Sequence, residues 1–246
     1  MKLFGKILAG LAVLLFVGFG YWRYDHTDRE SRVTEAALEA LESDAKVTVT
    51  QDDWIVFEPA GKKATKGLIF YPGGEVDERG YAQPLHHVAS AGYLVVMVPM
   101  PFQLAVYAID SAADVVAAYP EIDSWAIAGH SLGGSMAAYY AADHPDSIDG
   151  LLLWDAYAAN DMTTSKQAVR MIHRADENGE PPPGYAQHLP NHPQQTDYVP
   201  LVGGSHLNFG NFIAGRMYRD TPAPELDGDV QRGKVAVATI EFMNSL

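Results

Sequence analysis

The pattern of hydrophobic and polar positions divides the chain into an N-terminal part and a globular part. An apolar run broken only by glycines occupies residues 7–22, and a charged, Ala-rich stretch with apolar residues at helical spacing follows it. From residue 46 onward, short apolar runs alternate with longer amphipathic segments. We therefore expect three parts: a membrane-directed segment at 1–23, a helical spacer at 24–45 and one globular domain at 46–246.

Within the globular part the pattern predicts strands that alternate with helices. Short apolar runs are typical of buried strands, and longer amphipathic stretches that end at Gly or Pro are typical of helices. Strands are expected at 46–50, 54–57, 67–71, 93–98, 125–128, 150–154, 168–173 and 198–202. Helices are expected at 81–91, 104–119, 132–142 and 230–242. This alternation predicts an α/β fold in which a mostly parallel sheet has helices on both faces and the first two or three strands are antiparallel.

The apolar run near the N-terminus has the flanks of a signal segment. Two lysines precede it, and its 16 residues span about 24 Å as a helix. Tyr21 and Trp22 followed by Arg23 are typical of the end of an uncleaved transmembrane anchor, whereas the small residues at 18–20 are compatible with a cleavable signal peptide. A helix packed on the globular part is the third interpretation. The first two predict a membrane-anchored protein with an extracytoplasmic domain, or a secreted or periplasmic one.

The composition excludes several classes of partner and of functional site. The 246 residues include 17 Lys and Arg against 31 Asp and Glu, which gives a net charge of −14, and there is no cysteine. An acidic chain without a basic cluster repels phosphate backbones, so we expect no nucleic-acid partner. The lack of cysteine excludes disulfides, cysteine-based metal sites and a cysteine nucleophile.

A Gly-x-Ser-x-Gly motif, GHSLG at 129–133, directly follows the predicted strand at 125–128 and directly precedes the predicted helix at 132–142. A serine at such a sharp turn has a strained backbone, and the flanking glycines let strand and helix approach each other. The turn would place Ser131 at the carboxyl edge of the sheet, while His130 would pack beneath the turn. The motif predicts a nucleophilic serine; the alternative is a glycine-rich turn with an incidental serine.

Together with this motif, three segments make residues 46–244 resemble an α/β hydrolase. They are 67–104, which includes the sequence YPGG at 71–74, 129–134 and 203–210. The resemblance is strongest to a small lidless bacterial group related to dienelactone hydrolases. It implies the α/β-hydrolase fold with an eight-stranded sheet, a Ser-His-Asp triad and hydrolysis of carboxylic esters or related acyl bonds, without naming a substrate.

Two main-chain amides are candidates for an oxyanion hole. A tetrahedral oxyanion needs two convergent donors, and the loss of one costs about 10² to 10³ in rate. The N–H of Leu132, the residue after the serine, is the first candidate. The loop after the third predicted strand should supply the second, for which we predict Gly74, with Glu75 as the next choice.

His206 is the candidate general base. It lies C-terminal to the serine and follows the last predicted strand through the flexible sequence Gly203-Gly204-Ser205. The other histidines lie in predicted helices, beside prolines or within the serine motif.

The acid should end a strand between the serine and His206, and two aspartates qualify. Asp176 follows the predicted strand at 168–173, and Asp155 follows the one at 150–154; Asp161 is a more distant third. The resemblance points to Asp176, because most members of this fold carry the acid after the later strand.

These residues predict an acyl-transfer mechanism. His206 would take the proton of Ser131, the amides of Leu132 and Gly74 would hold the oxyanion, and Asp176 would orient the imidazole. The expected partners are a small acyl substrate and, through the N-terminal helix, a membrane; no metal or organic cofactor is required. Thioesterase, amidase or acyltransferase activity on the same triad, and a membrane-tethered binding domain without catalysis, are the alternatives.

Overall fold

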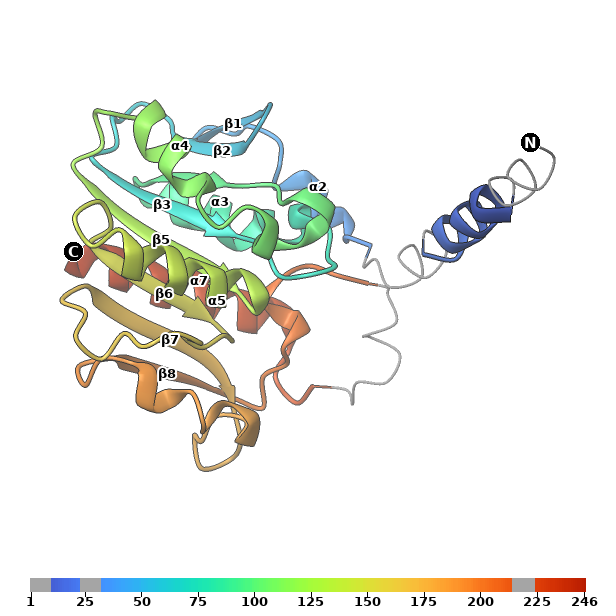
Figure 1. Ribbon diagram of the computed structural model, residues 1–246. Helices are drawn as coiled ribbons and strands as arrows, with labels where there is room; N and C mark the ends of the chain where they lie inside the picture. The colour runs from blue at the N-terminus through green and yellow to red at the C-terminus, as the bar shows by residue number, and fades with distance from the viewer. Residues whose placement is uncertain (1–9, 23–31, 214–223) are drawn as a thin grey trace.

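The structure, a computed structural model, describes residues 10–22, 32–213 and 224–246. In these residues eight strands form one sheet in the order β1-β2-β4-β3-β5-β6-β7-β8 (Figure 1). The strands are β1 Val47–Gln51, β2 Ile55–Pro59, β3 Lys66–Tyr71, β4 Leu94–Met97, β5 Ser124–His130, β6 Gly150–Trp154, β7 Ala168–Ala175 and β8 Asp197–Val202. β2 is antiparallel to β1 and to β4, and the remaining neighbouring pairs are parallel. The predicted mostly parallel sheet with an antiparallel start is confirmed.

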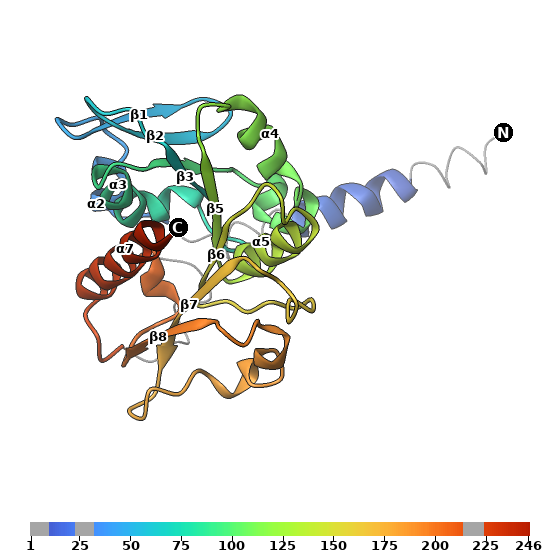
Figure 2. The same ribbon diagram turned by 90° about the vertical axis from the view of Figure 1, so that its left-hand side faces the viewer.

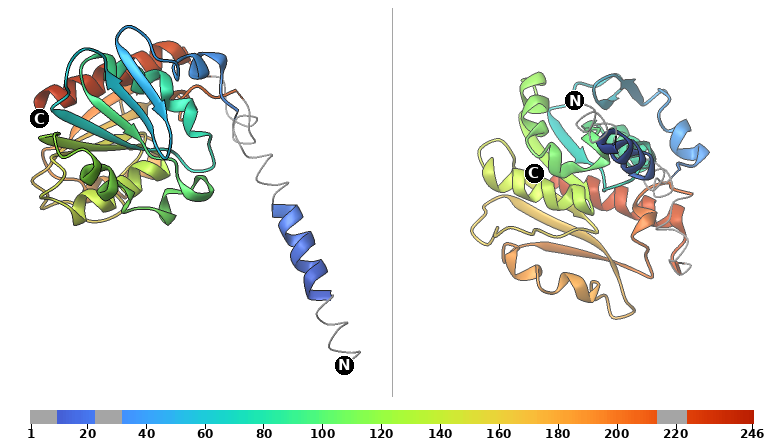
Figure 3. Two further views of the ribbon diagram at one scale, coloured as in Figure 1. Left: turned by 90° about the horizontal axis from the view of Figure 1, so that it is seen from above. Right: turned by 45° about the vertical axis from the view of Figure 1, so that its right-hand side comes forward.

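Helices cover both faces of the sheet. They are α2 Glu35–Glu39, α3 Ala82–Ser90, α4 Ser111–Ala118, α5 Leu132–Asp143 and α7 Gly228–Ser245. α3 and α7 pack against each other on one face, and α4 and α5 lie on the other (Figures 2 and 3). Short 3-10 helices occupy several loops: η1 Glu78–Tyr81, η2 Pro101–Gln103, η3 Ala105–Tyr107, η4 Pro183–Tyr185, η5 Leu189–Asn191 and η6 Leu207–Phe209.

The central strands are apolar on both sides because each face of the sheet packs against helices. Successive side chains of a strand point to opposite faces. Ile69 and Ile127 therefore belong to the core beneath α4 and α5, whereas Phe70 and Trp154 belong to the core beneath α3 and α7. Burial on both faces explains why these strands appear in the sequence as continuous apolar runs rather than as alternating patterns.

The helix predicted at 104–119 is shorter than the pattern indicates. Only α4 is α-helical, and η2 and η3 precede it. Within the predicted range, Leu104 has φ −133° and ψ 107°, and Ala108 has φ −151° and ψ 43°, and neither conformation is α-helical. Just before it, Phe102 and Gln103 have positive φ values of 55° and 58°. The carbonyl of Gln103 accepts the N–H of Glu75 at 3.0 Å, so this segment supports the loop after β3.

The N-terminal part is described only partly. Residues 10–22 form a helix with exposed side chains. Among the described residues, no helix combines the length and the apolar character needed to cross a membrane. Residues 1–9 and 23 of the predicted signal segment, and 24–31 of the predicted spacer, lie outside the described residues. In the rest of the spacer, α2 and the following turn bury Ala37 and Leu41 against the domain.

The parallel strands bring their carboxyl ends to one edge of the sheet. The loops after β3, β5, β6, β7 and β8 therefore meet there, as expected for ligand sites in parallel α/β sheets. This edge holds the residues described next.

Candidate active site

Ser131 occupies the sharp turn between β5 and α5. Its backbone has φ 51° and ψ −122°, a conformation that a non-glycine residue adopts only where the surroundings impose it. A Cβ added to Gly133 would lie 2.2 Å from the carbonyl oxygens of Tyr71 and Pro72, and one added to Gly129 would lie 2.5 Å from the backbone of Gly133. Close packing of strand and helix therefore requires both glycines of the motif, and the predicted strand–turn–helix context is present.

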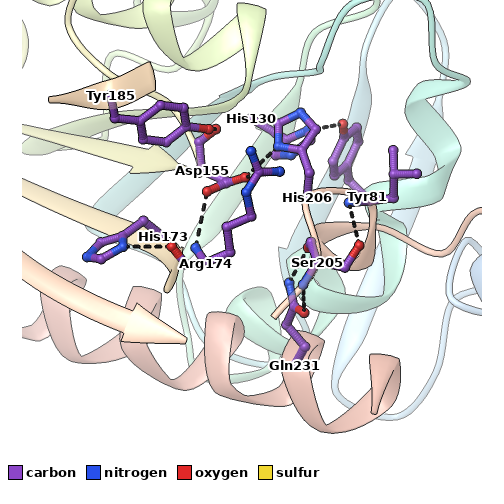
Figure 4. A network of polar contacts seen from close by, with 10 residues as sticks. Tyr81, His130, Asp155, His173, Arg174, Tyr185, Ser205, His206 and Gln231 are labelled. Atoms are coloured by element: carbon purple, nitrogen blue, oxygen red, sulfur yellow. Dashed lines mark hydrogen bonds and ion pairs between the residues drawn. The ribbon is translucent and has the colours of Figure 1, made fainter. Parts of the chain in front are cut away.

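His206 lies after β8 and is bound to Asp155 (Figure 4). Its Nδ1 is 2.5 Å from Asp155 Oδ2. The Asp155 side chain is fully buried, whereas that of His206 is 19% exposed. Asp155 directly follows β6 and has a positive φ of 42°, which turns the chain at the end of the strand. A neutral imidazole whose Nδ1 donates to a carboxylate presents Nε2 as its proton acceptor.

Asp176, the acid implied by the resemblance, is not the partner of His206. It lies in the exposed loop after β7, where its Oδ1 accepts the N–H groups of Asn178 and Glu180 at 2.9 and 3.0 Å. These main-chain hydrogen bonds, first that from Glu180, lower the pKa of Asp176. The prediction is corrected in favour of the alternative, Asp155, because β7 runs on to Ala175 and carries the following aspartate beyond the site.

Ser131 and His206 line one cavity of about 390 Å³. Its other lining residues are Leu132, Ser135, Asp155, Ala156, Tyr157, Arg174 and Tyr185. No hydrogen bond joins Ser131 to His206 in the described part of the chain. No group of three or more His, Asp or Glu side chains is placed to hold a metal ion within the same described residues.

Of the three amides at 73–75 in the loop after β3, two donate to partners among the described residues. Gly73 N–H donates to Tyr81 Oη at 3.2 Å, and Glu75 N–H donates to the carbonyl of Gln103. Gly74 abuts the side chain of Leu132, since a Cβ added to it would lie 3.0 Å from Leu132 Cδ2. Because the N–H of Glu75 already donates to Gln103, Glu75, the second choice for the oxyanion hole, is unsuitable as a donor. Leu132 opens α5, where the first N–H groups of a helix have no partner within it.

His130 packs beneath the serine turn, as predicted, and connects three loops. Its Nδ1 is 2.8 Å from Tyr81 Oη, which also accepts the N–H of Gly73. Its ring lies on that of His206, with the centroids 4.4 Å apart. Burial, and after it the neighbouring His206, holds the pKa of His130 well below its ordinary value. His130 is therefore a neutral group that joins the loop after β3 to the His206 loop.

Two further residues that the sequence pattern did not predict contribute to the site. Gln231 of α7 is fully buried and binds the main chain of Ser205 twice, accepting its N–H at 2.9 Å and donating to its carbonyl at 2.8 Å. This clamp holds the residue that precedes His206 (Figure 4). Arg174, at the end of β7, contacts Asp155. The sequence signals were weak: a polar residue in a mostly apolar helix face and an arginine at a strand end.

Comparisons with known proteins place this geometry in a family. The search of curated proteins gave no match. Three solved structures share the fold at low identity. Monoglyceride lipase from Saccharomyces cerevisiae, a soluble variant in complex with a substrate analogue, has a TM-score of 0.57 at 9% identity and covers 83% of this chain and 97% of its own. A predicted CIB-like hydrolase from Thermoplasma acidophilum has a TM-score of 0.54 at 13% identity, with coverages of 81% and 100%.

A structure from work on LipS and LipT, two metagenome-derived lipolytic enzymes, has a TM-score of 0.55 at 13% identity, with coverages of 87% and 100%. At these identities the likeness concerns the fold alone. The family model of the alpha/beta hydrolase family matches residues 67–224, which is more than half of the chain. That match includes the serine turn, Asp155 and His206, and the chain belongs to the alpha/beta hydrolase family.

Proposed function

We propose that the protein is a serine hydrolase that cleaves carboxylic esters or related acyl bonds through an acyl-serine intermediate. One observation carries the proposal. Ser131, in its strained turn, faces the same cavity as His206, whose Nδ1 is bound to the buried Asp155. A hydroxyl, an imidazole and a carboxylate in this order are the groups that activate a serine nucleophile.

In the proposed reaction the serine, the histidine, the aspartate and two main-chain amides have separate roles. His206 Nε2 takes the proton of Ser131 as Oγ attacks the acyl carbon, and the amides of Leu132 and Gly74 stabilise the oxyanion. Asp155 holds the imidazole and stabilises its cationic form. The imidazolium then protonates the leaving group, and a water molecule activated by the same histidine releases the acid.

The lipolytic activity named for two of the compared structures supports an acyl ester as the substrate class. The cavity agrees, since apolar and aromatic side chains such as Leu132 and Tyr157 line it beside the polar groups.

Covalent labelling of the full chain with a fluorophosphonate, followed by peptide mapping, tests the proposal. We expect the label on Ser131, and we expect Ser131→Ala to lose the label and at least about 10³-fold of its activity toward short p-nitrophenyl esters. Ser135→Ala is the matched control, because Ser135 lines the same cavity but its Oγ donates to the carbonyl of Tyr157 at 2.8 Å. This control should keep the label. Parent protein that neither labels nor hydrolyses esters would favour a binding domain without catalysis.

A further inference from the structure

Arg174 lies at the end of β7, two residues before Asp176, and its charge faces Asp155. Its main-chain N–H donates to Asp155 Oδ1 at 3.1 Å, and its guanidinium Nη1 lies 3.4 Å from Oδ2 (Figure 4). Oδ2 is also the oxygen that His206 Nδ1 contacts. The side chain of Arg174 is 33% exposed and lies over the ring of Tyr185, with Cζ 5.9 Å from the centroid.

Because Asp155 is buried, the stability of its carboxylate depends on the charges and hydrogen-bond donors around it. An ionised carboxylate with no exposed surface is strongly destabilised unless charged or hydrogen-bonding groups compensate it. The imidazole of His206 supplies one hydrogen bond, and Arg174 supplies a second together with a positive charge. Tyr185 donates its hydroxyl to the carbonyl of Asp155 at 2.7 Å, which holds the backbone rather than the carboxylate.

We propose that Arg174 is a positioning residue, which orients and charge-balances Asp155 and thereby extends the activity of the site toward lower pH. The inference rests on the proposed function, since it concerns the same histidine and serine.

The sign of the effect follows from the groups that face His206. These are Asp155 from the end of β6, Arg174 from β7, His130 from β5 and, through Asp155, Tyr185 from η4. His130 is neutral, because burial lowers its pKa, and Tyr185 is neutral, because burial and the charge of Asp155 raise its pKa.

Asp155 and Arg174 are therefore the charges that act on the imidazole from these elements. Without the guanidinium, the carboxylate is unbalanced and favours the imidazolium form. Because an imidazolium cannot accept the serine proton, activity would then be lost at a higher pH.

The experiment compares pH–rate profiles of the parent, Arg174→Gln and Arg174→Lys on a neutral p-nitrophenyl ester. For Arg174→Gln we expect the acid limb to move to higher pH by about half a unit to one unit, and kcat on the plateau to fall about tenfold while KM changes little. Arg174→Lys keeps the charge and should recover most of the pH shift. Arg170→Gln is the control on the same strand, since Arg170 is paired with Asp197 at 2.6 Å, and its profile should match that of the parent.

Two results would overturn the inference. One is an acid limb that stays in place in Arg174→Gln. The other comes from a second measurement, on an ester that carries a carboxylate: if Arg174→Gln raises only KM for that ester, Arg174 is a contact for substrate anions. The pH dependence of fluorophosphonate inactivation provides the same readout if turnover is too slow to measure. Ser131→Ala is measured in the same series. If the proposed function is wrong, the parent and Ser131→Ala will have the same activity. If only the role of Arg174 is wrong, the parent will be active and Arg174→Gln will have the same pH profile as the parent.

Discussion

At the scale of single residues, the structure decides which carboxylate meets the imidazole. Asp155 and Asp176 both follow parallel strands at the same edge of the sheet. Asp155 turns inward directly after β6 and is buried, whereas Asp176 is exposed and bonded within its own loop. Chain order alone permits either residue, because both lie between Ser131 and His206.

The pair Asp155→Asn and Asp176→Asn tests this assignment. Asn at 155 cannot hold the imidazole in the required tautomer, so we expect kcat/KM to fall by about 10² to 10⁴. Asn at 176 keeps the oxygen that accepts the two main-chain N–H groups, and kcat/KM should stay within about twofold. Steady-state kinetics on one ester provides the measurement. A large fall in kcat/KM for Asp176→Asn with little change for Asp155→Asn would instead identify Asp176 as the acid.

At the scale of elements, the site depends on the close approach of β5 and α5 to the end of β3. The positions of Gly129 and Gly133 leave no space for a side chain, and Tyr71 and Pro72 are the groups that a larger residue at 133 would meet. The serine turn and the loop after β3, which carries Gly74, are thereby held together.

Gly133→Ala and Gly233→Ala form a contrasting pair. The Cβ at 133 would meet main-chain oxygens, so the elements must separate; we expect a loss of about 2 kcal/mol or more in the free energy of unfolding, together with loss of activity. The Cβ at 233 on α7 would meet nothing within 4 Å. Alanine there should stabilise the helix by about 0.5–1 kcal/mol. Urea unfolding measures both changes, and equal stability of the two variants would refute the steric argument.

At the scale of the whole molecule, burial of neutral histidines makes stability depend on pH. His130 is only 2% exposed, and its pKa is held well below the ordinary value of 6.5. The unfolded chain therefore binds a proton at mildly acidic pH that the folded chain does not. Stability from this group is fully present above about pH 6.5 and is lost as the pH falls below that value.

His130→Gln should reduce this dependence. Between pH 6.5 and 5.5 the parent should lose up to about 1 kcal/mol more of its free energy of unfolding than the variant does. His192, whose pKa is lowered to about 4 mainly by burial, contributes to both proteins and cancels in the comparison. His87→Gln removes an exposed histidine as the control and should leave the slope unchanged. A parent and a His130→Gln variant with the same slope in urea titrations would contradict the prediction.

The hydrophobic pattern predicted the strands and most helices to within a few residues, because burial on one or both faces leaves a periodic signal in the chain. It overextended the helix before β5, because Leu104 and Ala108 have non-helical backbone angles and the α-helix begins only at Ser111. It also gave no role to Gln231 or Arg174, whose partners Ser205 and Asp155 lie on other elements.

The sequence by itself determined the parallel α/β architecture, the strained turn at Ser131 and the position of His206 after the last strand. These features depend on neighbouring residues and on chain order, which local sequence records directly. Only the tertiary structure decided that Asp155 meets His206, that Arg174 faces Asp155 and that the amides of Gly73 and Glu75, on either side of Gly74, are already bound. Those choices depend on how far each strand extends at the shared edge of the sheet and on which groups the surrounding loops already bind, and both are set by packing between segments far apart in the chain.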